Sequence, residues 1–284
     1  MKTQTNILST IAAITATISA CIGVFYSNGG VQRTVQNIYG QEVILFGNGI
    51  YANDSLIKVA ATKGTDIAII IVCIGIVLMV SVFRSKKFSP FLQCGLLSIV
   101  LYSSTCLIMG VSFNRLFLLY LIQFGSALFA FVLSMTEIIK SDNFNNVIYQ
   151  KRLKGTGVFM IIGGCSVLIW LTIILPSIIT GQPIETIEVY TTEPTFALDL
   201  AIILPSSVFC GFALLRKQII GYKIAPVLLT LLSGVGICVI FQTIVQTSLG
   251  IVLPIGQLLG MVMSFVILGT VAVVLNVRLL KHAK

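Results

Sequence analysis

The stretch Glu185–Lys217, ETIEVYTTEPTFALDLAIILPSSVFCGFALLRK, combines the features that decide the fold. Its first nine residues carry three acids and no base, and they lead into a long apolar run that ends at Arg216 and Lys217. The run contains Asp199 near its start and Pro205 in its middle. A run this long and apolar predicts a helix that spans a membrane. Asp199 then needs an explanation, because a carboxylate among lipid tails is costly.

The composition of the whole chain extends this prediction. Hydrophobic residues make up 57% of the 284 residues, charged residues only 10%, and the mean hydropathy is +1.05. These values are typical of a polytopic membrane protein in contact with a lipid bilayer. The formal charge of +9 does not indicate nucleic-acid binding, because the basic residues lie between apolar runs, as expected when they set the orientation of membrane helices.

Eight apolar runs predict an all-α membrane fold, a bundle of eight transmembrane helices that forms one integral membrane domain over residues 1–284. The first run passes through Ile18-Ser19-Ala20-Cys21, which resembles a lipoprotein cleavage site, but it continues to Tyr26 and so predicts an uncleaved helix. Cleavage at Cys21 remains the alternative. The runs are Ile7–Tyr26, Asp66–Phe83, Pro90–Val111, Leu116–Ile139, Thr156–Ile179, Phe196–Leu215, Ile224–Val245 and Ile255–Leu280.

The distribution of charge predicts the orientation of the bundle. One set of alternate loops, with both termini, holds fourteen of the eighteen Lys and Arg residues, and the other set holds four. Seven of the nine acids fall on or near the second side. Because basic loops stay in the cytoplasm, both termini are predicted to be cytoplasmic.

The only long loop on the predicted outer side is Ser27–Thr65. Two β-favouring runs, Val35–Tyr39 and Glu42–Phe46, are separated by turn residues and predict a hairpin. Asn53-Asp54-Ser55 then offers helix N-caps, and Gly64 can end the short helix that follows. The loop is therefore predicted to form a small extracytoplasmic cap, a hairpin plus a helix, between the first two transmembrane helices.

The residues that usually carry enzyme chemistry are scarce. The seven cysteines all lie inside apolar runs, where they are best explained as packing residues, and the only histidine is His282. The sequence has no phosphate-binding G-x-x-x-x-G-K, no H-E-x-x-H and no G-x-S-x-G. We therefore expect no enzymatic activity, no cofactor and no metal site.

Asp199 is the first candidate for a functional side chain. Thr195, Asp199, Ile202, Ser206 and Cys210 recur at helical spacing and predict one stripe on the sixth helix. Two interpretations stay open. Asp199 is either an interfacial acid stabilised by the positive end of its helix, or an acid that lines an outward-facing cavity as an ion ligand or proton acceptor.

Arg115 is the predicted partner of Asp199, because it begins the fourth helix on the same side of the membrane. Asp66 and Glu193 compete for the same guanidinium, and Asp66 is also explained as a cap of the second helix. Stripes on other helices are explained either by interhelical hydrogen bonds or by a translocation path. The full set of ion- or ligand-binding candidates is Asp199, Arg115, Asp66, Asp54, Tyr51, Glu193 and Tyr190.

Several short segments together resemble a family of bacterial polytopic membrane proteins to which no activity is assigned. They include Tyr39–Val43, Gly47–Asp54, Tyr190–Thr192, Ala197–Leu200 and Gly221–Pro226. The resemblance implies the bacterial plasma membrane and adds no catalytic residues. Independently of the resemblance, the polar candidates and the predicted cap lead us to expect a small-solute or cation permease with an outward-facing polar pocket. The alternative is an accessory or sensory subunit that binds a protein partner through its cap and helix surfaces.

Overall fold

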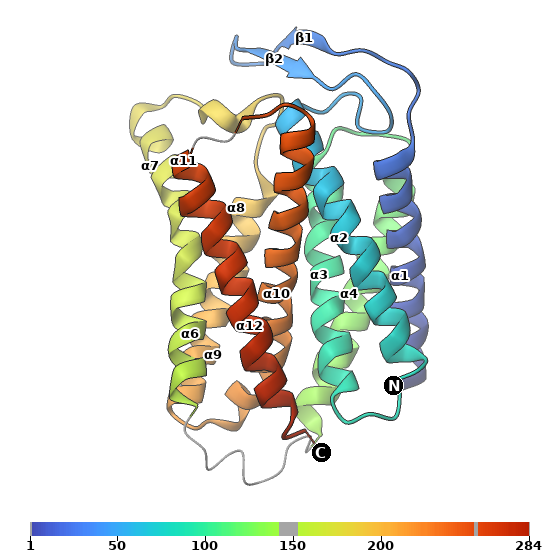
Figure 1. The fold of residues 1–284 in the computed structure, drawn as a ribbon, viewed down its shortest axis with the longest axis vertical. Coiled ribbons are helices and arrows are strands. Elements are labelled where there is room, and N and C mark those ends of the chain that lie inside the picture. The colour runs from blue at the N-terminus through green and yellow to red at the C-terminus, as the bar shows by residue number, and fades with distance from the viewer. Residues whose placement is uncertain (1, 142–152, 253–254, 284) are drawn as a thin grey trace.

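Eight long helices dominate the structure, a computed structural model that describes residues 2–141, 153–252 and 255–283. Each is long and apolar enough to cross a membrane, which confirms the predicted count and fits a multi-pass membrane protein (Figure 1). Their bounds are α1 (Lys2–Phe25), α2 (Leu56–Val80), α3 (Ser89–Gly110), α4 (Phe117–Lys140), α6 (Lys154–Cys165) with α7 (Leu171–Thr180), α8 (Pro194–Leu198) with α9 (Leu204–Leu215), α10 (Ile219–Ser248), and α11 (Ile255–Gln257) with α12 (Ser264–Leu280).

The first four helices form one packed group. Helix α1 packs against α2 and α4, and α3 packs against the same two helices. The buried face of α1 consists of small residues, among them Ala12, Ala16, Ala20 and Gly23. Small residues let helix backbones approach closely, which is the usual source of helix association in lipid.

Helix α10 joins this group to the rest of the molecule. It packs against α2 and α3 on one side and against α9 and α12 on the other. In its most apolar stretch 56% of the residues are buried, against 12% in Leu258–Leu280, so α10 is central and the last helix is peripheral. A Cβ atom added to Gly236 would lie 3.0 Å from Gly269 Cα, so the crossing of α10 and α12 depends on two glycines.

The helices of the second half are irregular. A 3-10 segment, Ser166–Trp170, separates α6 from α7, and a π-helical turn, Asp199–Ile203, separates α8 from α9. Pro205 follows that turn directly, Pro176 lies inside α7 and Pro226 lies inside α10, whereas Pro254 falls outside the described residues. Of these prolines Pro205 lies beside a break, and the hydrogen bond that its nitrogen cannot donate favours the irregular turn before it.

Helix α2 corrects the prediction for the long loop. It runs without a break from Leu56 to Val80, so the predicted cap helix and the second transmembrane helix are one helix. Gly64 does not end it. A Cβ atom there would lie 2.4 Å from Gln242 Cα, so this glycine lets α2 contact the backbone of α10. The N-cap is Ser55, whose hydroxyl accepts a hydrogen bond from Lys58 N.

The predicted hairpin is confirmed. Strands β1 (Arg33–Gln36) and β2 (Glu42–Leu45) pair antiparallel, with Val35 opposite Val43. The first strand is shorter than predicted, because residues 37–40 form the turn. An isolated bridge between Leu45 and Ser55 connects β2 to the start of α2. Figure 1 places the hairpin at one end of the bundle, the hairpin end, and both chain termini at the other, the terminal end.

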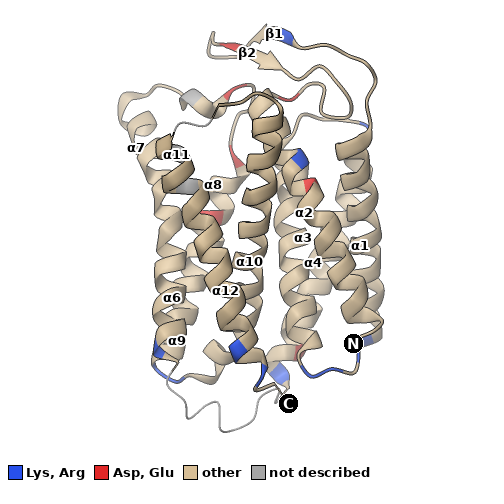
Figure 2. Ribbon diagram, in the orientation of Figure 1, with Lys and Arg blue, Asp and Glu red and all other residues tan. Residues whose placement is uncertain are grey.

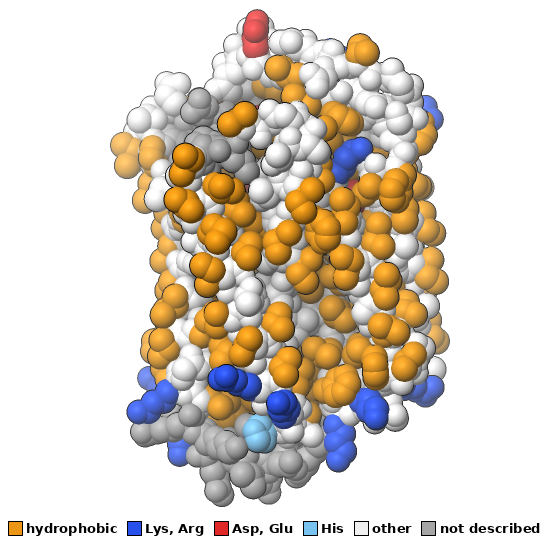
Figure 3. All heavy atoms as spheres, viewed as in Figure 1, with side chains coloured by type: hydrophobic (Ala, Val, Ile, Leu, Met, Phe, Trp, Pro, Cys, Tyr) orange, Lys and Arg blue, Asp and Glu red, His pale blue; other side chains and the backbone are white. Residues whose placement is uncertain are grey.

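Charged residues are separated along the bundle. Most Lys and Arg lie at the terminal end, and most Asp and Glu lie in the half nearer the hairpin (Figure 2). Figure 3 shows hydrophobic side chains over the middle of one face, with a row of Lys and Arg below them. Four charged residues counted from the sequence, Asp142, Lys151, Arg152 and Lys284, fall outside the described residues.

Candidate functional site

Three aspartates are buried in the half of the molecule nearer the hairpin. Asp54 is 1% exposed, Asp66 2% and Asp199 8%. None of them forms an ion pair, and Lys58–Glu193 is the one ion pair within the described residues. A buried carboxylate without a counter-charge is costly and is commonly a functional group in a membrane protein.

The Asp66 cluster consists of Asp66, Tyr51 and Tyr120. Asp66 lies in the third turn of α2, and the Tyr51 hydroxyl donates a hydrogen bond of 2.8 Å to its Oδ2. Burial, and then the neighbouring Asp66 carboxylate, raise the pKa of Tyr51 well above its ordinary value. The phenol therefore keeps its proton and acts as a donor. Helix α1 closes the cluster at Gly23, where an added Cβ atom would lie 2.1 Å from Asp66 Oδ2.

The base nearest to this cluster in sequence points elsewhere. Lys63 comes three residues before Asp66, and its ammonium donates to the carbonyl of Val24 at 3.3 Å. The ammonium also lies over the aromatic ring of Phe46, 5.2 Å from the ring centroid. Asp66 therefore has a positive charge in its surroundings but no bonded cation.

Buried polar side chains continue from the Asp66 cluster along α4. Tyr120 and Gln123 are three residues apart and share a buried face of this helix. The Tyr120 hydroxyl and Gln123 Nε2 are buried and form no well-aligned hydrogen bond within the described residues. Gln123 Oε1 accepts from the Ser19 hydroxyl of α1 at 2.9 Å. Of these two side chains, Tyr120 lies near the Asp66 carboxylate, and Gln123 extends the buried polar face of α4 by one turn.

Asp54 connects the loops of the hairpin end through hydrogen bonds. Its Oδ1 accepts from the backbone N–H of Ser112 at 2.7 Å and from the Tyr190 hydroxyl at 2.9 Å, and its Oδ2 has no partner within the described residues. Burial raises the pKa of Asp54, and the bonds from Ser112 and Tyr190 oppose this. Burial also raises the pKa of Tyr190. Asp54 is therefore not the N-cap of α2, a role that Ser55 fills, but the contact between three loops.

Glu188 and Glu193 bind the start of α2. Lys58 Nζ lies 2.6 Å from Glu193 Oε2 and 5.0 Å from the centroid of the Tyr190 ring. The Ser55 hydroxyl donates to Glu188, whose pKa is raised by burial. These contacts join the acidic segment before α8 to α2, which explains the acids at the start of the stretch Glu185–Lys217.

The Asp199 cluster consists of Asp199, Tyr102 and Trp170. The Tyr102 hydroxyl donates to Asp199 Oδ1 at 3.0 Å, and Trp170 Nε1 donates to Oδ2 at 2.7 Å. Both carboxylate oxygens therefore have partners, one from α3 and one from the 3-10 segment after α6. Asp199 joins three helices.

The stripe predicted from Asp199 is wrong at Ile202, although Cys210 at its far end is buried as Asp199 is. Asp199 begins the π-helical turn, which accommodates one extra residue and shifts the helix face that follows. Ile203 and Ser207 are buried, whereas Ile202 is 55% exposed. Periodicity of 3.6 residues cannot reveal such a turn, although Pro205 just after it was a signal.

The predicted pair of Asp199 and Arg115 is also wrong. Arg115 is exposed in the turn before α4 and forms no ion pair within the described residues. Aromatic donors satisfy Asp199, and Lys58 satisfies Glu193. Asp66 is not a helix cap either, because α2 begins ten residues earlier.

The structure brings the predicted candidates together in pairs that the sequence did not specify. Tyr51 meets Asp66, and Tyr190 meets Asp54. Sequence reasoning missed Trp170, Tyr120 and Lys58 as members of the site. Trp170 is the only tryptophan in the chain and an obvious donor for a buried acid, so its rarity was an available signal.

Two open hollows lie away from these clusters. One, of about 350 Å³, lies between the start of α1 and the end of α2, and the other, of about 510 Å³, lies along the last turns of α10. Neither is lined by the three buried aspartates. The outward-facing polar pocket therefore stays a prediction.

The fold and the buried polar clusters fit a multi-pass helical membrane protein with ionisable groups inside its bundle. No protein-family model, curated protein or solved structure matches this chain.

Proposed function

We propose that the protein spans the bacterial plasma membrane with its hairpin end outside and both termini in the cytoplasm. The separation of charge in Figure 2 supports this orientation, because basic residues gather on the cytoplasmic side of membrane proteins. A cysteine placed at Gln41 should react with a membrane-impermeant thiol reagent in intact cells, and one placed at Lys86 should not. The reverse pattern would overturn the orientation.

We further propose that the protein is a cation permease and that its cation is the proton. The observation that carries this proposal is Asp66, which is 2% exposed inside a membrane helix, bonded to a neutral tyrosine and without a bonded cation. Buried carboxylates in such surroundings commonly bind and release protons in transporters. In this proposal Asp66 takes up a proton that arrives from the hairpin side, while Tyr51 keeps its own proton and orients the carboxyl group through its hydrogen bond.

A line of polar side chains supports transfer toward the terminal end. Below Asp66, the buried face of α1 carries Ser19, Thr15, Ser9 and Thr5. Ser19 bonds to Gln123. Ser9 accepts at 2.9 Å from Gln93 of α3, whose amide also reaches Asn6. Polar groups thus lie along α1 from Gly23 to the terminal end, between alanines that keep the line narrow.

Proton flux into liposomes tests the proposal. The purified protein should acidify vesicles loaded with a pH-sensitive dye when an inward proton gradient is imposed. Asp66→Asn should abolish this flux, because the amide cannot take up the proton. Tyr51→Phe, which removes only the hydroxyl, should reduce it at least tenfold.

Glu42→Gln is the matched control, since it neutralises an exposed acid of the hairpin and should leave the flux unchanged. Each variant is compared by its melting temperature and its elution from a size-exclusion column, so that a folding defect is recognised. Equal flux through Asp66→Asn and the unchanged protein, with both folded, would overturn the proposal.

A second candidate is an accessory or sensory subunit that binds a protein partner. The observation that favours it is the apolar surface of the hairpin end, where Val31 is 80% exposed and Ile38 78%. Photo-crosslinking residues at these two positions should then capture one protein of the same membrane, whereas a residue at Gln36 should capture less. Absence of any specific crosslink would count against this candidate.

A further inference from the structure

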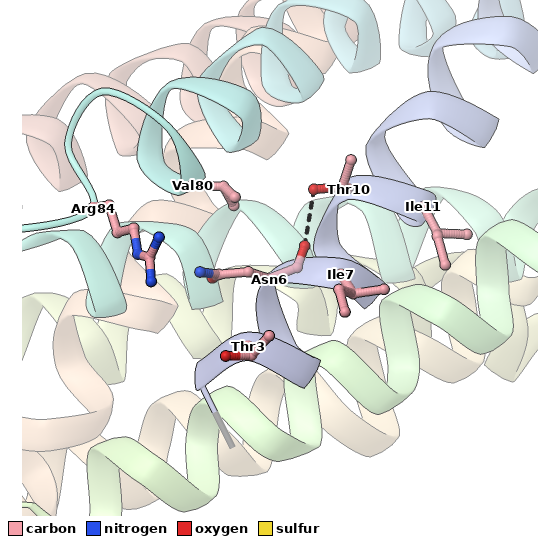
Figure 4. Close-up of a pocket in the computed structure, with 7 residues that line it drawn as sticks. All are labelled: Thr3, Asn6, Ile7, Thr10, Ile11, Val80 and Arg84. Carbon is pink, nitrogen blue, oxygen red and sulfur yellow. Dashed lines mark hydrogen bonds between the residues drawn. The ribbon is translucent and has the colours of Figure 1, made fainter.

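The hollow at the terminal end has two kinds of lining. It opens between the start of α1 and the end of α2, and Figure 4 shows its residues. The Arg84 guanidinium and the Asn6 amide extend toward each other in this view, with Val80 beside them. Thr3, Asn6 and Arg84 form a polar level, and Ile7, Ile11 and Val80 are apolar. Thr10 lies between the two isoleucines, and its hydroxyl donates to the backbone carbonyl of Asn6 at 2.9 Å.

The order of these residues follows the depth of the bundle. Arg84 lies in the loop after α2, and Thr3 and Asn6 lie in the first turns of α1, so all three are at the terminal end. Ile11 lies five residues beyond Asn6, about 7.5 Å deeper at a rise of 1.5 Å per residue. The hollow therefore changes from polar to apolar toward the middle of the bundle, as a phospholipid does from its headgroup to its chains.

The polar level carries positive charge that has no ion-pair partner within the described part of the chain. Arg84 is exposed and forms no ion pair within the described residues. Its loop, residues 81–88, also contains Lys86 and Lys87 and has no acid. Basic clusters at the ends of membrane helices attract anionic headgroups. The apolar level is matched to an acyl chain by Ile7, which is 55% exposed, and by Ile11, which is 37% exposed.

We propose that this hollow binds an anionic phospholipid, with the phosphate on Arg84 and Asn6 and one acyl chain along Ile7, Ile11 and Val80. The lipid would add a contact between α1 and α2 at the terminal end of the bundle. Lipid binding in this hollow does not depend on the direction of transport or on the identity of the cation.

Lipid binding to the full-length protein tests it. Protein in detergent is incubated with phosphatidylglycerol or phosphatidylcholine, and bound lipid is counted by native mass spectrometry. Phosphatidylglycerol should be retained in preference to phosphatidylcholine. Arg84→Gln should weaken its binding about fivefold, the effect of one basic residue near an anionic lipid.

Arg216→Gln is the matched control, because Arg216 is exposed after α9 and does not line the hollow. It should leave binding unchanged. Ile11→Trp fills the apolar level without altering charge. It should weaken the binding of phosphatidylglycerol but leave the binding of inorganic phosphate unchanged. The proposal would be overturned if Arg84→Gln and Arg216→Gln lost equal amounts of phosphatidylglycerol binding. It would also be overturned if inorganic phosphate protected the protein from thermal unfolding as strongly as phosphatidylglycerol does.

Discussion

The Asp66 and Asp199 clusters are built from the same kinds of side chain, but they differ in how many carboxylate oxygens accept a side-chain hydrogen bond. In each, a buried aspartate of a membrane helix is bonded by aromatic side chains instead of a base. Asp199 accepts at both oxygens, from Tyr102 and from Trp170. Asp66 accepts a side-chain hydrogen bond from Tyr51 and lies near the Tyr120 hydroxyl, which forms no well-aligned hydrogen bond within the described residues.

This difference separates two uses of a buried acid. Asp199 joins α3, the segment after α6 and the π-helical turn, and a fully bonded carboxylate of this kind stabilises the contact between helices. Asp66 lies in a regular helix and has a side-chain hydrogen bond from Tyr51, and the proposed function assigns it the transported proton. We therefore expect changes at Asp199 to act on stability and changes at Asp66 to act on transport.

The largest effect is expected at Gly23, which closes the Asp66 cluster. Gly23→Ala adds a Cβ atom 2.1 Å from Asp66 Oδ2 and 2.8 Å from the Tyr51 hydroxyl, so α1 must move. Overpacking of this kind should lower the free energy of unfolding by about 3 kcal/mol, the upper end of the usual range. The melting temperature in detergent measures it.

Gly125→Ala is the control for that change. Gly125 lies in α4 with open space around its Cα, so alanine there should be neutral or slightly stabilising. If both variants melt alike, α1 is not packed against Asp66 as described, and the Asp66 cluster is as open as a surface site.

A smaller effect is expected at Trp170. Trp170→Phe preserves an aromatic ring beside Phe196, whose ring centroid is 5.2 Å away, but removes the donor to Asp199 Oδ2. The loss of a hydrogen bond to a charged group should lower the free energy of unfolding by about 2 kcal/mol. Proton flux per folded molecule should stay unchanged. Lost flux with an unchanged melting temperature would reverse the roles of the two aspartates.

Much of the fold could be predicted from the sequence, because apolar length and charge alternate strongly along it. The eight spans and the hairpin required only hydropathy and turn residues. The start of α2 could not be found in this way, since Lys58 and Lys63 interrupt the apolar pattern and Gly64 has the appearance of a stop signal. The contact of Gly64 with α10 is a tertiary fact that local propensity does not contain.

The site could be predicted by residue type but not by pairing. Asp199 was recognised as a costly acid, whereas Asp54 and Asp66 were explained as helix caps. The partners lie far away in the sequence: Tyr102 and Trp170 for Asp199, and Tyr190 for Asp54. Charge alone favoured a basic partner. The structure uses hydroxyl and indole donors instead, which satisfy a carboxylate without burying a second charge.

The smallest effect is expected at Arg115, the base that charge alone had paired with Asp199. The side chain is exposed and forms no ion pair within the described residues, so Arg115→Gln should change the free energy of unfolding by less than about 0.5 kcal/mol. Asp199→Asn should cost more, because the amide presents a donor to the Tyr102 or Trp170 group that now donates. If the two residues are independent, the double variant should show the sum of the single losses. Recovery of stability in the double variant would show that the two charges are coupled. Arg115 would then be a partner of Asp199, and the contrast between the Asp199 and Asp66 clusters would have to be redrawn with that base in it.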